Sequence, residues 1–96
     1  MRVSAWNDRK KTYGLRIGTH NQKEFFCPGW DKIVVEIVGQ PHCIKLTNAF
    51  WKGCPEIQDP VLRKWLARHC SLAWPKGIPP HAELLPLGGN QFRLLP

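Results

Sequence analysis

Apolar and polar residues alternate most clearly at Lys32–Val38, whose sequence KIVVEIV is dense in β-branched side chains. A period of two places three of these side chains on one face, which should be the core side: Ile33, Val35 and Ile37. The turn residues Gly39 and Gln40 come next, and Pro41–Leu46 then supplies a second short strand. This arrangement predicts a β-hairpin with a tight connection.

Weaker strand signals lie on either side of this hairpin. Tyr13–Ile17 alternates enough to form one strand. Further along, Ala82–Leu87 and Gln91–Leu95 flank the sequence Gly-Gly-Asn, whose glycines suit the positive φ angles of a hairpin turn. Residues 1–12 are polar and basic, so we expect either a flexible arm or the lead-in to the first strand. Gly18–Lys23 is expected to form an exposed loop.

A helix is predicted at Pro60–Cys70, because Asp59 is a favourable N-cap and proline is favoured at the first helical position. A rotation of about 100° per residue gathers the apolar side chains and one histidine on a single face: Val61, Leu62, Trp65, Leu66 and His69. This face should dock on the sheet, with His69 buried in the core. One further helical turn is expected at Asn48–Lys52, capped by Thr47.

Prolines and glycines mark the remaining connections. Glu24–Trp30 contains a Pro-Gly turn signal among three aromatic residues, and residues 74–80 (WPKGIPP) should form a stiff connector because prolines lack an amide donor. The chain has no internal repeat and no domain linker, so we expect residues 1–96 to form a single domain. The order of elements predicts a small α+β fold. Its mostly antiparallel, curled sheet or partial barrel would consist of two hairpins and an N-terminal strand, packed against one amphipathic helix.

The charge balance indicates which partners the protein attracts. Fourteen Lys and Arg residues against seven Asp and Glu give a net charge of +7, which favours polyanions such as nucleic acid. No apolar run approaches the ~20 residues that span a bilayer. The N-terminal residues also lack the apolar region of a signal peptide. A cytoplasmic protein without a membrane partner is therefore expected.

The polar face of the predicted helix is the strongest candidate surface. Arg63, Lys64 and Arg68 project around the small Ala67, which allows close approach of a phosphate backbone. A solvated face on a basic protein is the simpler interpretation of the same pattern. Arg9, Lys10 and Lys11 form a second basic group within the N-terminal arm.

Two loop-like segments combine aromatic and basic residues. Trp51 is followed by Lys52, and Trp74 lies two residues before Lys76. Such pairs are typical of platforms on which unpaired bases stack. The leading hypothesis is therefore a basic binding module. It would contact nucleic acid through the helix face, the basic residues of the N-terminal arm and these loop aromatics.

Metal binding and catalysis find little support in the sequence. The cysteines, Cys27, Cys43, Cys54 and Cys70, lack the short ligand pairs of zinc sites, so we expect buried, unpaired thiols. The chain also lacks a phosphate-binding glycine loop, a nucleophile motif and paired carboxylates. We predict a protein that is not an enzyme and that has no metal or cofactor.

Two alternatives remain open at this stage. In the first, an apolar patch is buried by a partner protein or a second copy of the chain: Phe25, Phe26, Trp30, Trp51 and Trp74. The C-terminal hairpin, ending in Leu94–Pro96, would lend an open strand edge to this interaction. In the second alternative, an aromatic-lined cavity inside the curled sheet holds a small ligand.

Overall fold

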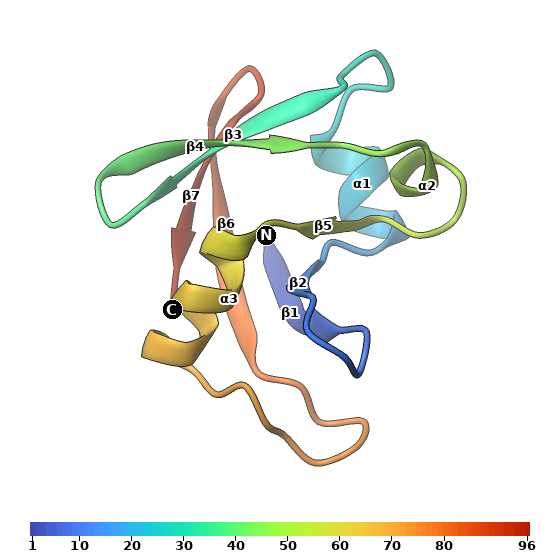
Figure 1. The fold of residues 1–96 in the computed structure, drawn as a ribbon. Helices are drawn as coiled ribbons and strands as arrows, with labels where there is room; N and C mark the ends of the chain where they lie inside the picture. The colour runs from blue at the N-terminus through green and yellow to red at the C-terminus, as the bar shows by residue number, and fades with distance from the viewer.

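The computed structural model describes all residues 1–96, and its strands form one mixed sheet in the order β4-β3-β7-β6-β1-β2-β5. The strands are β1 (Arg2–Asn7), β2 (Tyr13–Arg16), β3 (Lys32–Ile37), β4 (Gln40–Lys45), β5 (Glu56–Gln58), β6 (His81–Gly88) and β7 (Gln91–Leu95). The outer strands β4 and β5 approach each other, so that the sheet nearly closes (Figure 1). The small α+β fold with a curled sheet is confirmed.

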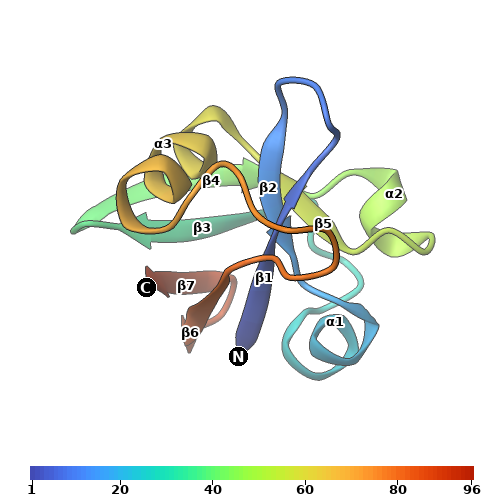
Figure 2. The same ribbon diagram turned by 90° about the horizontal axis from the view of Figure 1, so that it is seen from below.

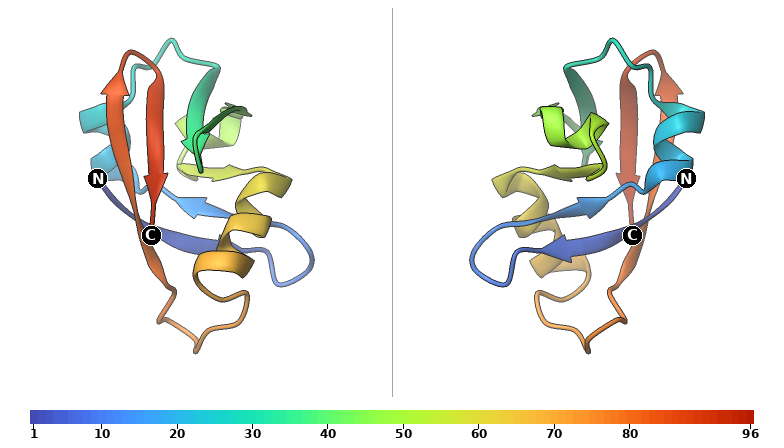
Figure 3. Two further views of the ribbon diagram at one scale, coloured as in Figure 1. Left: turned by 90° about the vertical axis from the view of Figure 1, so that its left-hand side faces the viewer. Right: turned by 90° about the vertical axis from the view of Figure 1, so that its right-hand side faces the viewer.

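Three helices lie around the sheet: α1 (Thr19–Phe25), α2 (Asn48–Trp51) and α3 (Pro60–His69). Figure 1 shows α1 and α2 near one another at one end, with α3 and the long connector that follows it at the other. The two views of Figure 3 place α3 beside the tip of the β1–β2 hairpin. This second end carries most of the candidate residues.

Both predicted hairpins form, but the first one turns at Val38 and Gly39, one residue earlier than the predicted Gly39 and Gln40, and Gln40 already belongs to β4. β3 and β4 pair antiparallel, and the three side chains assigned to the core side of β3 are at most 5% exposed: Ile33, Val35 and Ile37. β6 and β7 also pair antiparallel, around glycines with positive φ angles. The β6–β7 hairpin is not a free edge, however, because β7 also pairs in parallel with β3 and β6 pairs with β1. The predicted open edge is therefore confined to Leu94–Pro96, which lie beyond the residues Gln91–Arg93 that pair with β3.

The N-terminal segment is a strand rather than a flexible arm. β1 lies between β6 and β2, and its Val3 and Ala5 are buried in the core. Only Asp8–Thr12 remain as a turn, and they carry the basic group Arg9, Lys10 and Lys11 at the tip of the β1–β2 hairpin. The alternative expectation, a lead-in to the first strand, is closer to the structure.

Residues 19–25 form helix α1 instead of the expected loop. This helix buries no residue and has no side-chain N-cap. Contacts from other parts of the chain hold it in place, since the Asn21 amide donates hydrogen bonds to the carbonyls of Arg2 (2.9 Å) and Ile17 (3.0 Å). The Gln22 amide likewise donates to the carbonyl of Phe50. The helix therefore depends on tertiary contacts that its own sequence does not reveal.

Helix α3 begins as predicted, with Asp59 as its N-cap and proline at its first turn. Leu62, Trp65 and Leu66 are buried against the core, but His69 is exposed, and its ring lies 5.2 Å from that of Trp65. The expectation of a buried core histidine is wrong: His69 is the last residue of α3 and lies beyond Leu66, the last buried residue of the helix.

Replacing Asp59 with Ala should lower the stability of the protein by about 1 kcal/mol. The Asp59 carboxylate accepts a hydrogen bond from the Val61 amide at 2.9 Å, and alanine leaves this donor without its partner. Urea denaturation measures the change. An Asp59→Asn variant should lose much less, because asparagine is an equally good cap. Equal losses in both variants would contradict the capping role.

Candidate functional site

A surface hollow of about 580 Å³ opens between the β1–β2 hairpin and the proline-rich connector. The residues that line it come from β1, β2, the hairpin tip and the connector: Ala5, Trp6, Asn7, Arg9, Arg16, Trp74, Lys76, Gly77 and Pro79. We call it the Trp6 hollow. It brings together three residues that the sequence predicted for nucleic-acid binding, Arg9, Trp74 and Lys76, of which Arg9 lies far from the other two along the chain.

Trp6 faces outward because β1 alternates, with Val3 and Ala5 pointing into the core. Across the β1–β2 ladder Trp6 is opposite Gly14, so the neighbouring strand offers no side chain to cover the indole ring. The ring is half-buried and does not belong to the group of apolar side chains packed on the core. Trp6 is therefore a large aromatic residue that the core does not use.

Trp74 is fixed on the opposite side of the hollow by Tyr13. The Trp74 ring meets the Tyr13 ring edge-on at 6.2 Å, and the Tyr13 hydroxyl donates a 2.9 Å hydrogen bond to the carbonyl of Leu72. This arrangement ties the start of the connector to strand β2. Trp74 thus reaches the hollow in a defined position.

The connector itself is braced along its length. The amide of Ile78 donates to the carbonyl of Pro75 (3.0 Å), which closes a turn in which Gly77 has a φ of +79°. At its far end, the carbonyl of Pro80 accepts a 2.8 Å hydrogen bond from the Ala5 amide on β1. Figure 2 shows the connector running across the β1–β2 strands. The prediction that this proline-rich connector has no regular secondary structure is confirmed.

The cations of the hollow differ in their partners. Arg16 is held by Glu56, with 3.0 Å between Nε and the carboxylate oxygen. Arg9 and Lys76 have no acidic partner within ion-pair distance. Two positive charges at the hollow are therefore free to bind an external anion.

The hairpin tip is ordered by its own hydrogen bonds. The Asp8 carboxylate accepts hydrogen bonds from the amides of Lys10 (2.8 Å) and Thr12 (3.1 Å), and the Asn7 side chain accepts one from the Arg9 amide (2.9 Å). The bond from the Lys10 amide, the largest contribution, lowers the pKa of Asp8, which stabilises the charged form. Any stability gained from this shift is present above the usual carboxyl pKa and is lost as the pH falls below it. The charged Asp8 carboxylate that accepts these hydrogen bonds is therefore the form present at neutral pH.

The basic surface continues from Tyr13 to helix α3. The Arg63 guanidinium lies over the Tyr13 ring, 5.5 Å from its centre, in a cation–π contact. A smaller hollow of about 330 Å³ is lined by Lys11, Tyr13 and Arg63, among others. Because Tyr13 contacts both Arg63 and Trp74, this second hollow and the Trp6 hollow lie on adjoining surface.

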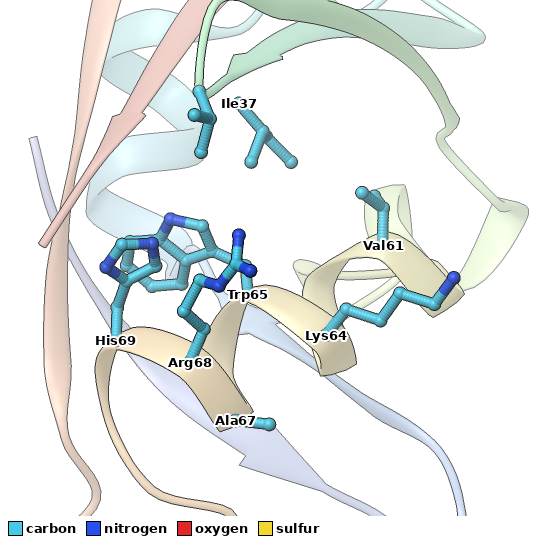
Figure 4. Close-up of a pocket in the computed structure, with 8 residues that line it drawn as sticks. Ile37, Val61, Lys64, Trp65, Ala67, Arg68 and His69 are labelled. Carbon is cyan, nitrogen blue, oxygen red and sulfur yellow. The ribbon is translucent and has the colours of Figure 1, made fainter.

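The cations of the predicted basic face of α3 line two different hollows. At about 100° of rotation per residue, Arg63 and Arg68 point about 140° apart around the helix axis, whereas Lys64 and Arg68 point only about 40° apart. Arg63 accordingly faces Tyr13, while Lys64 and Arg68 line a different hollow together with Val61 (Figure 4). All three cations are exposed around Ala67, as predicted, but they do not line one common hollow.

Trp51 and Lys52 lie away from this surface. Trp51 is in α2, where its ring meets Phe50 edge-on at 4.9 Å and its indole N–H donates to the carbonyl of Trp30 (3.2 Å). Lys52 is exposed at the C-cap of the same helix. The structure does not bring either residue to the Trp6 hollow.

Sequence reasoning missed Trp6, Tyr13 and Arg16 as members of the candidate site. The available signal was the alternation of Arg2–Asn7, which indicates a strand with Trp6 on its outer face. The position of Arg16 follows in turn, because Ser4 and Arg16 face each other in the β1–β2 register.

The cysteines and histidines form no constellation in the structure. No group of three or more metal-ligating side chains occurs, and the cysteines are unpaired. Cys27, Cys43 and Cys54 are exposed, so the expectation that the cysteines are buried is wrong for these three. Burial raises the pKa of the Cys70 thiol, which disfavours the reactive thiolate.

Two of the five aromatic residues proposed for an exposed patch, Phe26 and Trp30, pack on each other. Phe26 is 5% exposed and contacts Trp30, Phe50 and Phe92, with ring centres 5.1–5.9 Å apart. Phe25, Trp30 and Trp51 are half-buried against the same core, and Trp74 is at the Trp6 hollow. Of the five residues of the expected patch, Phe26 is therefore part of the core, and the other four are only partly exposed. The interior of the sheet is likewise filled by the hydrophobic core, where the small-ligand alternative placed a cavity.

Two further observations complete the description of the chain. None of its helices has the length and apolar character that crossing a membrane requires. Comparisons with protein-family models, with curated proteins and with solved structures find no significant match.

Proposed function

We propose that the protein binds single-stranded nucleic acid at the Trp6 hollow. The observation that carries this proposal is the meeting of two tryptophans, Trp6 and Trp74, with the unpaired cations Arg9 and Lys76 around one hollow. Aromatic faces and backbone-binding cations are the combination that single-strand binding proteins use. The net charge of +7 supports the same class of ligand.

Each part of the hollow has a role in this proposal. The Trp6 ring offers a stacking surface for an unpaired base, which typically contributes about 1–3 kcal/mol. Arg9 and Lys76 neutralise the flanking phosphates. Arg16, held by Glu56, is a less available charge. Lys11 and Arg63 on the adjoining surface extend the path of the backbone.

Single strands fit this arrangement better than duplexes. Bases within a duplex are stacked on one another, so they do not present their faces to a protein side chain. A hollow of about 580 Å³ admits an unstacked base, whereas a duplex would touch only its charged rim. We therefore expect the difference in affinity between single and double strands to depend on Trp6.

The test compares a labelled single-stranded oligonucleotide with its duplex by fluorescence anisotropy at low salt. Trp6→Leu keeps much of the apolar area but removes the aromatic face, and we expect it to lower single-strand affinity about tenfold. Trp6→Phe retains an aromatic ring and should bind nearly as well as the wild type. Because Trp6 lies outside the core, both variants should fold.

A Trp51→Phe variant is the control, since Trp51 packs in α2 away from the hollow. Its affinity should match that of the wild type. Equal binding by wild type and Trp6→Leu, or duplex affinity as high as that for the single strand, would overturn the proposal.

A further inference from the structure

A third hollow, which shares no residue with the Trp6 hollow, lies between α3 and the β3–β4 turn (Figure 4). It has a volume of about 600 Å³, and its apolar side is formed by Ile37, Val38, Val61 and Trp65. A smaller hollow of about 200 Å³ shares Val38, Trp65 and His69 with it and continues to Leu95 and Pro96. The two together form an elongated groove, which we call the α3 groove.

Val38 is the most unusual residue of this groove. It has a φ of +50°, a conformation that β-branched residues almost never adopt, and the residue is 72% exposed. Gly39 follows with a φ of +78°, so the turn has the φ signs of a type I′ hairpin, in which asparagine is the favoured residue before glycine. Neither burial nor backbone preference explains a valine here, and strained residues of this kind cluster at binding sites.

The charges around the α3 groove are mainly positive. Lys64 and Arg68 lie on its rim, and neither has an acidic partner within ion-pair distance. Figure 4 shows the Arg68 side chain extending from α3 toward Ile37. The one acidic residue of the groove, Glu36, is occupied by two hydrogen bonds from Arg93, at 3.0 and 3.3 Å. An acidic ligand would therefore meet free cations.

We propose that the α3 groove binds an extended, acidic segment of a partner protein that carries a large apolar side chain. The apolar side chain contacts Val38 and Val61, and the flanking carboxylates pair with Lys64 and Arg68. Two joined hollows suit an extended chain better than a compact molecule, which needs a more enclosed site. The Trp65 ring is only 4% exposed, so the groove lacks the open indole face of the Trp6 hollow, and nucleic acid is the less suitable occupant.

The test uses a panel of short labelled peptides in which a leucine, isoleucine or phenylalanine is flanked by glutamates, with fluorescence anisotropy as the readout. We expect at least one peptide to bind, and its counterpart with glutamines in place of the glutamates to bind about tenfold more weakly. Val38→Asn and Arg68→Ala should each lower the affinity by about tenfold. The Val38→Asn protein stays folded, because asparagine is better suited than valine to this φ.

Trp6→Leu is the matched control, because Trp6 lies outside the α3 groove and its replacement should leave peptide binding unchanged. Failure of nucleic-acid binding at the Trp6 hollow would therefore not affect this result. The proposal is overturned if no peptide of the panel binds, or if Val38→Asn and Arg68→Ala bind like the wild type. It is also overturned if the protein self-associates through Val38, since the occupant would then be a second copy of the chain.

Discussion

Gly14→Ala is expected to lower the free energy of unfolding by about 2–4 kcal/mol. This is the largest loss of stability that we expect from any glycine-to-alanine substitution in the chain. A Cβ atom at Gly14 would lie 2.0 Å from the carbonyl oxygen of Ile57 on β5, far inside any normal contact distance. The obstacle is backbone rather than a flexible side chain, so β2 and β5 must separate to make room. Ile57 is 1% exposed, and its displacement would also disturb the core.

Urea denaturation of wild type and variant measures this loss. Gly29→Ala is the matched control, because an added Cβ there meets no atom within 4 Å and the backbone needs no positive φ. The control should change stability by less than about 1 kcal/mol. A Gly14→Ala protein as stable as the control would show that β2 and β5 separate at little cost.

The Gly14→Ala substitution should also change the geometry of the Trp6 hollow. Gly14 is opposite Trp6 in the β1–β2 register and is flanked on β2 by Tyr13 and Leu15. Tyr13 in turn contacts Trp74 and Arg63. A shift of β2 would therefore move the aromatic residues of the hollow relative to one another.

The second large effect concerns the salt dependence of oligonucleotide binding. Replacing both Arg9 and Lys76 with Ala should reduce the slope of log affinity against log salt concentration by about 1.4. Each lost phosphate contact on a single strand contributes about 0.7 to that slope. Affinity at low salt should fall as well, because the counterions released by the two contacts no longer drive binding. Anisotropy titrations at several salt concentrations measure both quantities.

A double variant at Lys23 and Lys45 serves as the control for net charge. These lysines lie on α1 and β4 and line neither the Trp6 hollow nor the adjoining one. Their replacement with Ala removes the same charge from the protein, but it should leave the slope within a few tenths of the wild-type value. Equal changes in both double variants would mean that net charge, and not the hollow, determines binding.

The sequence predicted the elements whose signals are local. Alternating apolar residues and turn glycines predict both hairpins. Asp59, Pro60 and an apolar face predict α3. The short helix α2 was expected from Thr47, whose hydroxyl accepts a hydrogen bond from the Phe50 amide. In each of these cases the residues that specify the element lie within or beside it.

The missed elements are those that other parts of the chain stabilise. Strand β5 has only three residues, Glu56–Gln58, and is defined by its pairing with β2. Helix α1 is polar and uncapped, and the side chains of Asn21 and Gln22 bond to distant carbonyls. Strand order is equally non-local, since the parallel pairing of β3 with β7 joins residues from far along the chain.

The same distinction explains the candidate site. Arg9, Trp74 and Lys76 were identified by residue type, but their meeting depends on the connector that crosses β1 and β2. Trp51 and Lys52 are the same two residue types as Trp74 and Lys76, but they lie in and beside α2, away from the Trp6 hollow. The sequence therefore identifies residue types that suit nucleic-acid binding, whereas only the fold shows which of these residues lie together in one site. Nucleic-acid binding, the absence of enzymatic activity and a cytoplasmic location stay predictions.

The position of β7 in the sheet has a consequence for how the protein folds. This strand alone joins the β3–β4 hairpin to β6, β1, β2 and β5 within the strand order, through pairs such as Glu36 and Arg93 that are 57 residues apart. Closing so long a loop is entropically costly before any contact compensates for it. Folding should therefore be slow for a chain of this size, with both halves of the sheet gaining their final stability in a single cooperative step.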